Sequence, residues 1–260
     1  MRTNKRLGQH FLYDPSILGR IVDAADLSPD DTVVEIGPGP GALTRLLSEK
    51  AKNVIAIELD EALYERLRAD LIGYRNVELA HEDALKFPFE KIGEFKVVAN
   101  IPYYITTPLI FRLLEAGKHL RSMTLTIQKE VAERIVAQPG GKDYGVLSIM
   151  VQYQAEPELI CVIPKESFRP MPKVDSAVVH MKIRPQPPVA VDDEKLFFRI
   201  IRTAFSQRRK TLANSLRGIS DNIKGILINA GIDPVRRPET LSIEEFAMLA
   251  GAIGKSRREG

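Results

Sequence analysis

The segment Val33-Val-Glu-Ile-Gly-Pro-Gly-Pro-Gly-Ala42 constrains the fold of this chain most, because a glycine-rich turn stands between an apolar, β-branched run and an amphipathic run. Glycines let a backbone pass close to a ligand where a Cβ would clash. A strand, such a turn and a helix in this order are typical of cofactor-binding α/β folds. The segment therefore predicts a bound cofactor near Gly37 and Gly39.

The stretch from about 30 to 130 repeats this alternation of β-branched runs and amphipathic runs. The predicted strands are Thr32–Ile36, Asn53–Glu58, Asn76–Ala80, Phe95–Ala99 and Met123–Ile127. The predicted helices between them include Ala42–Lys50, Glu61–Leu71 and Pro108–Ala116. Two later runs, Val146–Gln154 and Ala177–Ile183, are predicted strands that close the sheet at one edge. This pattern predicts a Rossmann-like α/β domain with a mostly parallel sheet, over residues 1–185.

A proline cluster separates this domain from the rest of the chain. Three prolines in Pro185-Gln-Pro-Pro188 are incompatible with a helix or a central strand, so we expect a linker near 184–192. Beyond it, the predicted helices are Glu194–Ala204, Thr211–Leu216, Asn222–Asn229 and Ile243–Ile253. Residues 190–260 are thus predicted to form a small α-helical domain, with Lys255–Gly260 as a loose tail.

Charge and cysteine content limit the partners and the compartment. The formal net charge is only +3, but the stretch from Arg199 to Arg217 holds basic residues and no acidic one. Such a block favours either phosphate contacts with nucleic acid or a solvated helix face. The single cysteine, Cys161, and the lack of a Cys/His cluster argue against disulfides and a metal site. With no apolar run long enough to span a membrane, we expect a cytoplasmic protein.

The glycine-rich turn is compatible with two classes of cofactor. Gly37, Gly39 and Ala42 satisfy the dinucleotide pattern G-x-G-x-x-G/A, so a nicotinamide enzyme is one alternative. Pro38 and Pro40, however, have no N–H to donate to a pyrophosphate. This absence favours S-adenosylmethionine, which carries no phosphate.

Three carboxylates are placed to contact such a cofactor. Glu58 ends the second predicted strand, where it can accept both ribose hydroxyls of either cofactor. Asp83 follows the third strand and is a candidate acceptor for the cofactor's adenine amino group, or else a turn residue. Glu35, near the end of the first strand, is a candidate for orienting the charged end of the cofactor.

The segment Asn100-Ile-Pro-Tyr103 follows the strand Phe95–Ala99, at the sheet edge where ligands bind in open α/β folds. The Asn100 side chain and the carbonyl of Ile101 or Pro102 can accept the two hydrogens of an exocyclic amine. Tyr103 can stack on a base taken out of its own stack. The segment therefore predicts methylation of adenine N6, for which positioning matters more than acid-base catalysis.

Several motifs resemble those of the small-subunit (16S) ribosomal RNA adenine N6,N6-dimethyltransferase family over nearly the whole chain. They are Leu7-Gly-Gln-His-Phe-Leu12, Asn100-Ile-Pro-Tyr-Tyr104, Gln128-Lys-Glu130, Phe168-Arg-Pro-Met-Pro-Lys-Val-Asp-Ser176 and Phe205-Ser-Gln-Arg-Arg-Lys-Thr211. The resemblance implies a class I S-adenosylmethionine-dependent methyltransferase fold. It also implies methylation of two adjacent adenines in a 3′-terminal hairpin loop of small-subunit ribosomal RNA.

The resemblance also implies roles for individual residues. Cofactor contacts carry over to His10, Leu12, Gly37, Glu58, Asp83 and Asn100. The family commonly has asparagine at His10, so a backbone contact is expected there. Phe168 resembles an aromatic that faces the target base opposite Tyr103, and a loop anchor is the alternative. Arg208, Arg209 and Lys210 are predicted to bind RNA from a helix.

The expected partner is small-subunit ribosomal RNA within a pre-ribosomal small subunit, bound by a monomer, with no DNA and no membrane involved. Three other functions stay open. The first is methylation of a single adenine in large-subunit ribosomal RNA, and the second is a ribosome-assembly factor without essential catalysis. The third, a nicotinamide oxidoreductase, lacks any group suited to hydride transfer. The Phe168–Ser176 and Phe205–Thr211 segments favour the small subunit over the large one.

Overall fold

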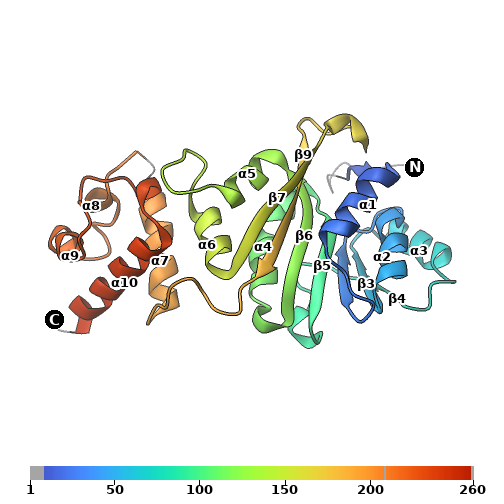
Figure 1. Cartoon of the computed structure of the whole chain (residues 1–260), viewed down its shortest axis with the longest axis horizontal. Helices are drawn as coiled ribbons and strands as arrows, with labels where there is room; N and C mark the ends of the chain where they lie inside the picture. The colour runs from blue at the N-terminus through green and yellow to red at the C-terminus, as the bar shows by residue number, and fades with distance from the viewer. Residues whose placement is uncertain (1–8, 208, 259–260) are drawn as a thin grey trace. The chain divides into compact units, whose positions relative to one another are not determined.

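The computed structural model describes residues 9–207 and 209–258 (Figure 1). These residues form two compact units. The larger unit contains residues 9–132 and 156–183, and the smaller unit contains residues 133–155 and the chain from 184 onward. The smaller unit thus includes a stretch, 133–155, that lies within the larger domain expected from the sequence.

A seven-stranded sheet forms the centre of the larger unit, in the order β4-β3-β2-β5-β6-β9-β7. The strands are β2 (Thr32–Ile36), β3 (Asn53–Glu58), β4 (Val77–His81), β5 (Phe95–Asn100), β6 (Leu120–Gln128), β7 (Ala155–Ile163) and β9 (Ser176–Ile183). The pairs β2–β3, β3–β4, β2–β5 and β5–β6 are parallel, whereas β9 is antiparallel to β6. The mostly parallel sheet is therefore confirmed, and the strand order reverses between β2 and β5, the position at which ligands bind in such folds.

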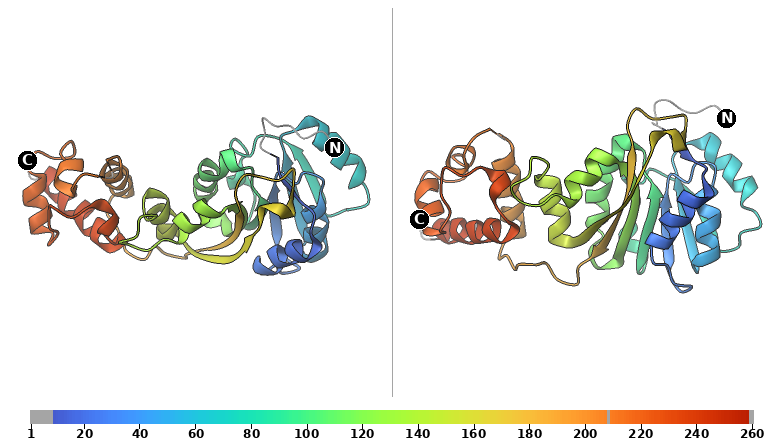
Figure 2. Two further views of the ribbon diagram at one scale, coloured as in Figure 1. Left: turned by 90° about the horizontal axis from the view of Figure 1, so that it is seen from above. Right: turned by 45° about the horizontal axis from the view of Figure 1, so that its top comes forward.

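Helices cover this sheet, and local sequence explains where two of them begin. The helices are α1 (Pro15–Ala24), α2 (Ala42–Lys50), α3 (Glu61–Asp70) and α4 (Thr106–Leu114) (Figure 2). A further helix, α5 (Lys129–Val136), begins in the larger unit and ends in the smaller one. Asp14 and Asp60 cap α1 and α3, because their carboxylates accept backbone N–H groups of the first turn. Buried residues of α1 and α2 form one apolar cluster with β2, β3 and β5, so both helices pack on the same face of the sheet.

A short ladder ties the start of the chain to a distant loop. Strand β1 (Phe11–Leu12) pairs antiparallel with β8 (Phe168–Arg169). Phe11 lies opposite Arg169, and Leu12 lies opposite Phe168. The ladder therefore fixes residues 11 and 12 against the segment that precedes β9.

One predicted strand, Val146–Gln154, is wrong, because these residues form helix α6. Nearly every side of this helix is buried, and a short, continuous apolar run has no clear period that separates helix from strand. The strand at the sheet edge is instead β7, which the sequence did not predict. The prediction for Ala177–Ile183 is confirmed by β9.

The smaller unit has a helical core. Besides α6, its helices are α7 (Glu194–Phe205), α8 (Leu212–Ser215), α9 (Ile223–Asn229) and α10 (Ile243–Arg258). Tyr144, Ile149 and Tyr153 are buried in the same apolar cluster as Phe197 and Phe246. This packing explains why 133–155 belongs to this unit. The predicted helices after the linker are confirmed, but the predicted loose tail is wrong as far as Arg258, where α10 ends.

Within residues 9–207 and 209–258, no helix is both long enough and apolar enough to cross a membrane. The same residues contain no group of three or more His, Cys, Asp or Glu placed to hold a metal ion.

Candidate active site

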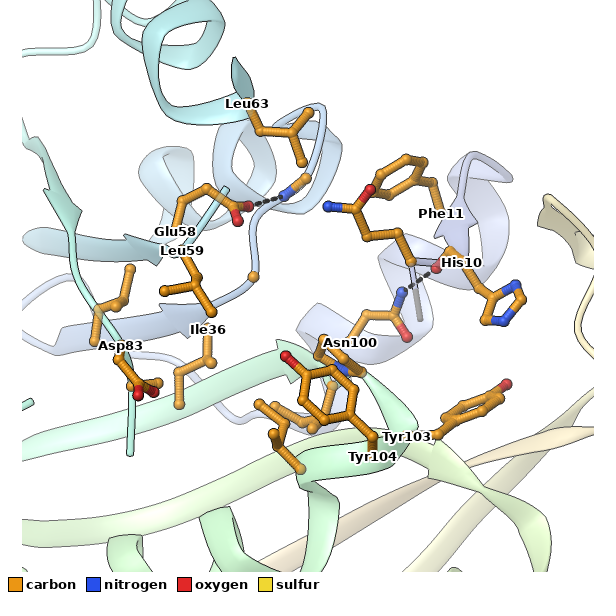
Figure 3. Close-up of a pocket in the computed structure, with 18 of the residues that line it drawn as sticks. His10, Phe11, Ile36, Glu58, Leu59, Leu63, Asp83, Asn100, Tyr103 and Tyr104 are labelled. Atoms are coloured by element: carbon orange, nitrogen blue, oxygen red, sulfur yellow. Dashed lines mark hydrogen bonds between the residues drawn. The ribbon is translucent and has the colours of Figure 1, made fainter. Parts of the chain in front are cut away.

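A pocket lies at the carboxyl ends of β2, β3 and β5, where the strand order reverses (Figure 3). The sequence-predicted residues that line it are His10, Gly37, Gly39, Glu58, Asp83, Asn100, Pro102 and Tyr103. Figure 3 shows Glu58 and Asp83 on one side, here called the acidic end. Asn100, Tyr103 and His10 lie on the other side, here called the amide end.

The glycine turn between β2 and α2 forms one wall of the pocket. Gly37, Gly39 and Gly41 all have positive φ angles, which other residues adopt with strain. The three N–H groups donate to the Ile57 carbonyl, the Glu58 carboxylate and the Pro38 carbonyl, respectively. Since prolines occupy the two positions between them, residues 37–41 have no N–H left for a pyrophosphate. This geometry supports the inference from Pro38 and Pro40 that the turn does not bind a pyrophosphate.

The acidic end is built on Glu58, which is only 5% exposed at the end of β3. Its carboxylate accepts the N–H groups of Asp60, at 2.9 Å, and Gly39, at 3.3 Å. Burial raises the pKa of Glu58 above its ordinary value, although these two N–H groups act in the opposite direction. The carboxylate is thus held in place by main-chain donors.

Asp83 adds a second carboxylate to this end and accepts the Leu85 N–H at 3.0 Å. Glu82 also lines the pocket, and no Lys or Arg of the described residues does so. Burial first, and then Asp83 and Glu58, raise the pKa of the Tyr104 phenol, whose ring is 53% exposed. An acidic pocket without phosphate donors fits S-adenosylmethionine, whose sulfonium and ammonium groups are positively charged.

Glu35 does not line the pocket, contrary to the cofactor contact predicted for it. Its side chain is 2% exposed, and its Oε2 atom has no hydrogen-bond partner among the described residues. Burial, and to a smaller extent the nearby Glu58, raise the pKa of Glu35 to about 8. Glu35 is therefore a buried acid that is mostly neutral at pH 7.

At the amide end, Asn100 is the last residue of β5, and its Nδ2 donates to the His10 carbonyl at 2.9 Å. This bond leaves the Oδ1 atom on the opposite side of the amide. Pro102 follows and starts a short 3-10 helix, Tyr103–Ile105. Tyr103 is half-buried, and its hydroxyl shares a 2.7 Å hydrogen bond with Ser176 at the start of β9. Segments far apart in the sequence therefore meet here.

Leu12 and Phe168 lie elsewhere. Both belong to the apolar cluster beneath α1 and α2, and the Phe168 ring is 0% exposed. The β1–β8 ladder places these two residues opposite each other, and both side chains pack in the core. A ring with no exposed surface cannot stack on a base, so the base-facing position expected for Phe168 is corrected to a core position in this structure.

The basic block also differs from expectation. Arg208 lies outside the described residues, and Arg209 and Lys210 are exposed in the connection between α7 and α8. The helix predicted for Arg209 and Lys210 is wrong, because α7 ends at Phe205, where its buried apolar face ends. These two cations are on a loop of the smaller unit.

Several lining residues were not singled out from the sequence. Phe11 packs so closely that a Cβ on Gly39 would lie 2.7 Å from its ring. Tyr104 and Gln9 lie within two motifs highlighted in the sequence, so their position beside predicted site residues could have identified them as lining residues. The remaining ones are mostly aliphatic, namely Ile36, Ile57 and Leu59 near strand ends, Leu63 on α3 and Ile105 in the 3-10 helix. Aliphatic residues at such places are indistinguishable from ordinary core residues in one sequence.

The chain is similar to known proteins over nearly its whole length. The family model described as ribosomal RNA adenine dimethylase matches residues 1–254. A curated relative from Clostridium acetobutylicum, "Ribosomal RNA small subunit methyltransferase A", is 49% identical over 97% of this chain and 94% of its own length. A relative of the same name from Geobacillus kaustophilus is 48% identical over 96% of this chain and 90% of its own length.

Two solved structures are similar over nearly the whole chain. A dimethyladenosine transferase from Plasmodium falciparum has a TM-score of 0.82 and 29% identity, covering 95% of this chain and 98% of its own. The 23S rRNA methyltransferase ErmE has a TM-score of 0.73 and 28% identity, covering 94% and 99%. Together with the family match and the pocket, these likenesses show that the chain belongs to the ribosomal RNA adenine dimethylase family and is an S-adenosylmethionine-dependent methyltransferase.

Proposed function

We propose that this enzyme transfers methyl groups to N6 of two adjacent adenines in a 3′-terminal hairpin loop of small-subunit (16S) ribosomal RNA, giving N6,N6-dimethyladenosine. The name of the curated relatives, which match nearly the full chain, supports the small subunit. The observation that carries the chemistry is the orientation of Asn100. Because its Nδ2 is held by the His10 carbonyl, its Oδ1 is the atom left to accept a hydrogen bond from a substrate amine.

In this proposal, S-adenosylmethionine binds at the acidic end. Glu58 accepts the ribose hydroxyls, and Asp83 accepts the adenine amino group of the cofactor. When bound, the cofactor supplies an electrophilic methyl group on a sulfonium. The acidic lining stabilises that positive charge, and the enclosed pocket fixes the direction of transfer.

The amide end prepares the attacking nitrogen. The lone pair of adenine N6 is delocalised into the ring, so the amine is a poor nucleophile. Two carbonyl acceptors on its hydrogens favour a tetrahedral nitrogen with a free lone pair. Asn100 Oδ1 is the first acceptor. The Ile101 carbonyl is favoured as the second, since the Pro102 carbonyl already accepts the Ile105 N–H at 3.2 Å, and no described group donates to Ile101.

Tyr103 holds the base flat by stacking, once the nucleotide is flipped out of the hairpin loop. Burial raises the pKa of the Tyr103 phenol, so the ring stays neutral at physiological pH. No proton-transfer residue is needed for the methyl transfer itself, because the donor is already activated. The roles assigned to Asn100 and Tyr103 are therefore positioning and electrostatic ones.

The smaller unit supplies part of the RNA grip in this proposal. Arg209 and Lys210 are exposed and stand in a stretch without acidic residues. Replacing both with glutamine should weaken RNA binding and lower its salt slope by up to roughly two units. The control replaces Lys195 and Lys224, two exposed lysines of α7 and α9, and removes the same charge. If both double variants change the slope equally, the loop has no specific role.

The proposal also includes a monomeric, cytoplasmic enzyme that acts on a partly assembled small subunit. The test is transfer of labelled methyl from S-adenosylmethionine to undermethylated small subunits, to naked small-subunit RNA and to large subunits in parallel. Dimethyladenosine on the small subunits is the expected product. Product on large subunits would favour the activity that the name of the similar ErmE structure describes. Tight binding without transfer would leave an assembly factor.

A further inference from the structure

His10 contacts three separate parts of the amide end. Its backbone carbonyl accepts the Asn100 Nδ2 at 2.9 Å, and its ring Nδ1 lies 2.7 Å from the Pro170 carbonyl oxygen. Its ring also stacks on Tyr103, with ring centroids 5.5 Å apart and an interplanar angle of 29° (Figure 3). One residue thus joins the acceptor amide, the stacking ring and the loop before β9.

The contact with Pro170 indicates which ring nitrogen of His10 carries a proton. A carbonyl oxygen can only accept a hydrogen bond, so Nδ1 must carry the proton and donate it. In the neutral ring, Nε2 is then the bare nitrogen. The side chain therefore acts here as an aromatic ring with one directed donor.

Tyr103 is held from two directions as a result. Its hydroxyl bonds Ser176 at one end, and its ring lies against His10 along one face. His10 is itself anchored, because the next residues, Phe11 and Leu12, pair with Arg169 and Phe168 in the β1–β8 ladder. The ring of Tyr103 has little freedom to turn while these contacts persist.

We propose that His10 is a positioning residue that fixes the plane of Tyr103 and the loop at Pro170 before RNA binds. This inference rests on the proposed function, in which the flipped adenine stacks on Tyr103. His10 occupies one face of that ring and the adenine occupies the other. The imidazole lies away from the proposed cofactor site, on the opposite side of the pocket from Glu58 and Asp83.

Three variants separate the two side-chain contacts. His10→Asn keeps a donor at the position of Nδ1 but has no ring, whereas His10→Phe keeps a ring but has no donor. His10→Ala removes both. All three keep the backbone carbonyl that holds Asn100. The matched control is His81→Phe. The His81 ring also stacks on a tyrosine, Tyr64, with centroids 4.9 Å apart, and its Nε2 lies 3.2 Å from the Leu59 carbonyl oxygen.

We expect kcat for methyl transfer to fall about 3- to 10-fold in His10→Asn, since an aromatic pair contributes roughly that factor. His10→Phe should fall about 5- to 10-fold, because the Pro170 carbonyl loses its donor. In His10→Ala, kcat should fall by about the product of these two factors, roughly 15- to 100-fold. The KM for RNA and the Kd of S-adenosylmethionine, measured by calorimetry without RNA, should stay within about two-fold, and kcat of His81→Phe should match wild type.

Other results would overturn the inference. A lower KM for RNA in His10→Asn and His10→Ala would mean that the imidazole only fills the place of the base and must leave. A weaker cofactor Kd in all three variants would make residue 10 a cofactor contact. Side-chain ¹⁵N spectra, assigned by comparison with His10→Asn, should show a protonated Nδ1; a bare Nδ1 would contradict the bond to Pro170.

The substrates distinguish failure of this inference from failure of the proposed function. Wild-type enzyme is assayed on small and large subunits in the same experiment, and the variants are compared on whichever substrate it methylates. Wild-type product on large subunits alone refutes the proposed substrate but still tests His10. Equal kcat values for wild type and His10→Ala refute only the positioning role.

Discussion

The acidic end and the amide end of the pocket are held by contacts of different range. Glu58 and Asp83 accept hydrogen bonds from main-chain groups no more than 19 residues away. At the amide end, the bonds join residues 73, 90 and 160 positions apart: Tyr103 to Ser176, Asn100 to His10, and His10 to Pro170. The acidic end is therefore a local product of a strand, a turn and a helix, whereas the amide end depends on tertiary assembly.

This difference suggests a division of work. In the proposed function, the locally fixed acidic end binds the cofactor, so it should set the affinity for the cofactor. The amide end contacts the target amine, so it should determine the rate of methyl transfer. Variants at the two ends should therefore separate binding from turnover.

The largest effect is expected for Asn100→Ala, which removes the side-chain acceptor. Methyl transfer should fall by about two orders of magnitude or more, as for other preorganised polar groups, while the Kd of S-adenosylmethionine changes less than about three-fold. Single-turnover methyl transfer and calorimetry measure the two quantities. The control, Asn76→Ala, removes an amide that bonds the Ser48 and Ala51 carbonyls and should cost stability but not turnover. Near-normal turnover in Asn100→Ala would refute the assigned mechanism.

An intermediate effect is expected for Glu58→Gln at the acidic end. Loss of the charged acceptor should raise the cofactor Kd about 10- to 100-fold, with kcat at saturating cofactor within a few-fold of wild type. Calorimetry and steady-state kinetics provide the comparison, and Glu78→Gln, an exposed glutamate on β4, is the matched control. A fall in kcat at unchanged Kd would erase the distinction between the two ends.

The smallest effect concerns Glu35, behind the acidic end. The folded chain keeps the Glu35 proton up to pH about 8, whereas the unfolded chain releases it near the ordinary pKa of 4.5. Stability must therefore fall as pH rises between these values and not change further above them. Glu35→Gln lacks this loss, so the excess of its Tm over that of wild type should be larger at pH 9 than at pH 5, by roughly 2–4 °C for each kcal/mol of stability that wild type loses.

Thermal unfolding at pH 5, 7 and 9 measures this difference, with Glu78→Gln as the exposed control. A Tm difference independent of pH would show that Glu35 is charged in the folded protein. The acidic end would then carry a full buried charge in place of a neutral carboxyl.

The range of the contacts also explains what the sequence could predict. The glycine turn, the end of β3 at Glu58 and the segment Asn100–Tyr103 are local patterns, and all of them line the pocket. Phe168 is different, because a two-residue ladder with β1 determines which way its ring faces. Nothing within a few residues of Phe168 contains that information.

Helix α6 illustrates the same limit in the fold. Two of its buried residues, Ile149 and Tyr153, pack in the apolar cluster of the smaller unit with helices that come much later in the chain. The lack of a polar face removed the period that normally identifies a helix. The end of α7 at Phe205 was also hard to predict from the sequence. The helix ends where its buried residues end, at Ala204, and no capping motif marks this place.

The β1–β8 ladder has a consequence for synthesis of the protein. The acidic end can form once translation has passed β4, but the strand partner of Phe11 and the Pro170 carbonyl that His10 contacts are absent until residues 168–170 have been made. At about 5–20 residues per second, translation from β4 to residue 170 takes several seconds, and the amide end is incomplete during this time. Residues 10 and 11 are thus made early but are among the last to take their place, and a nascent chain that ends before β8 has no complete amide end.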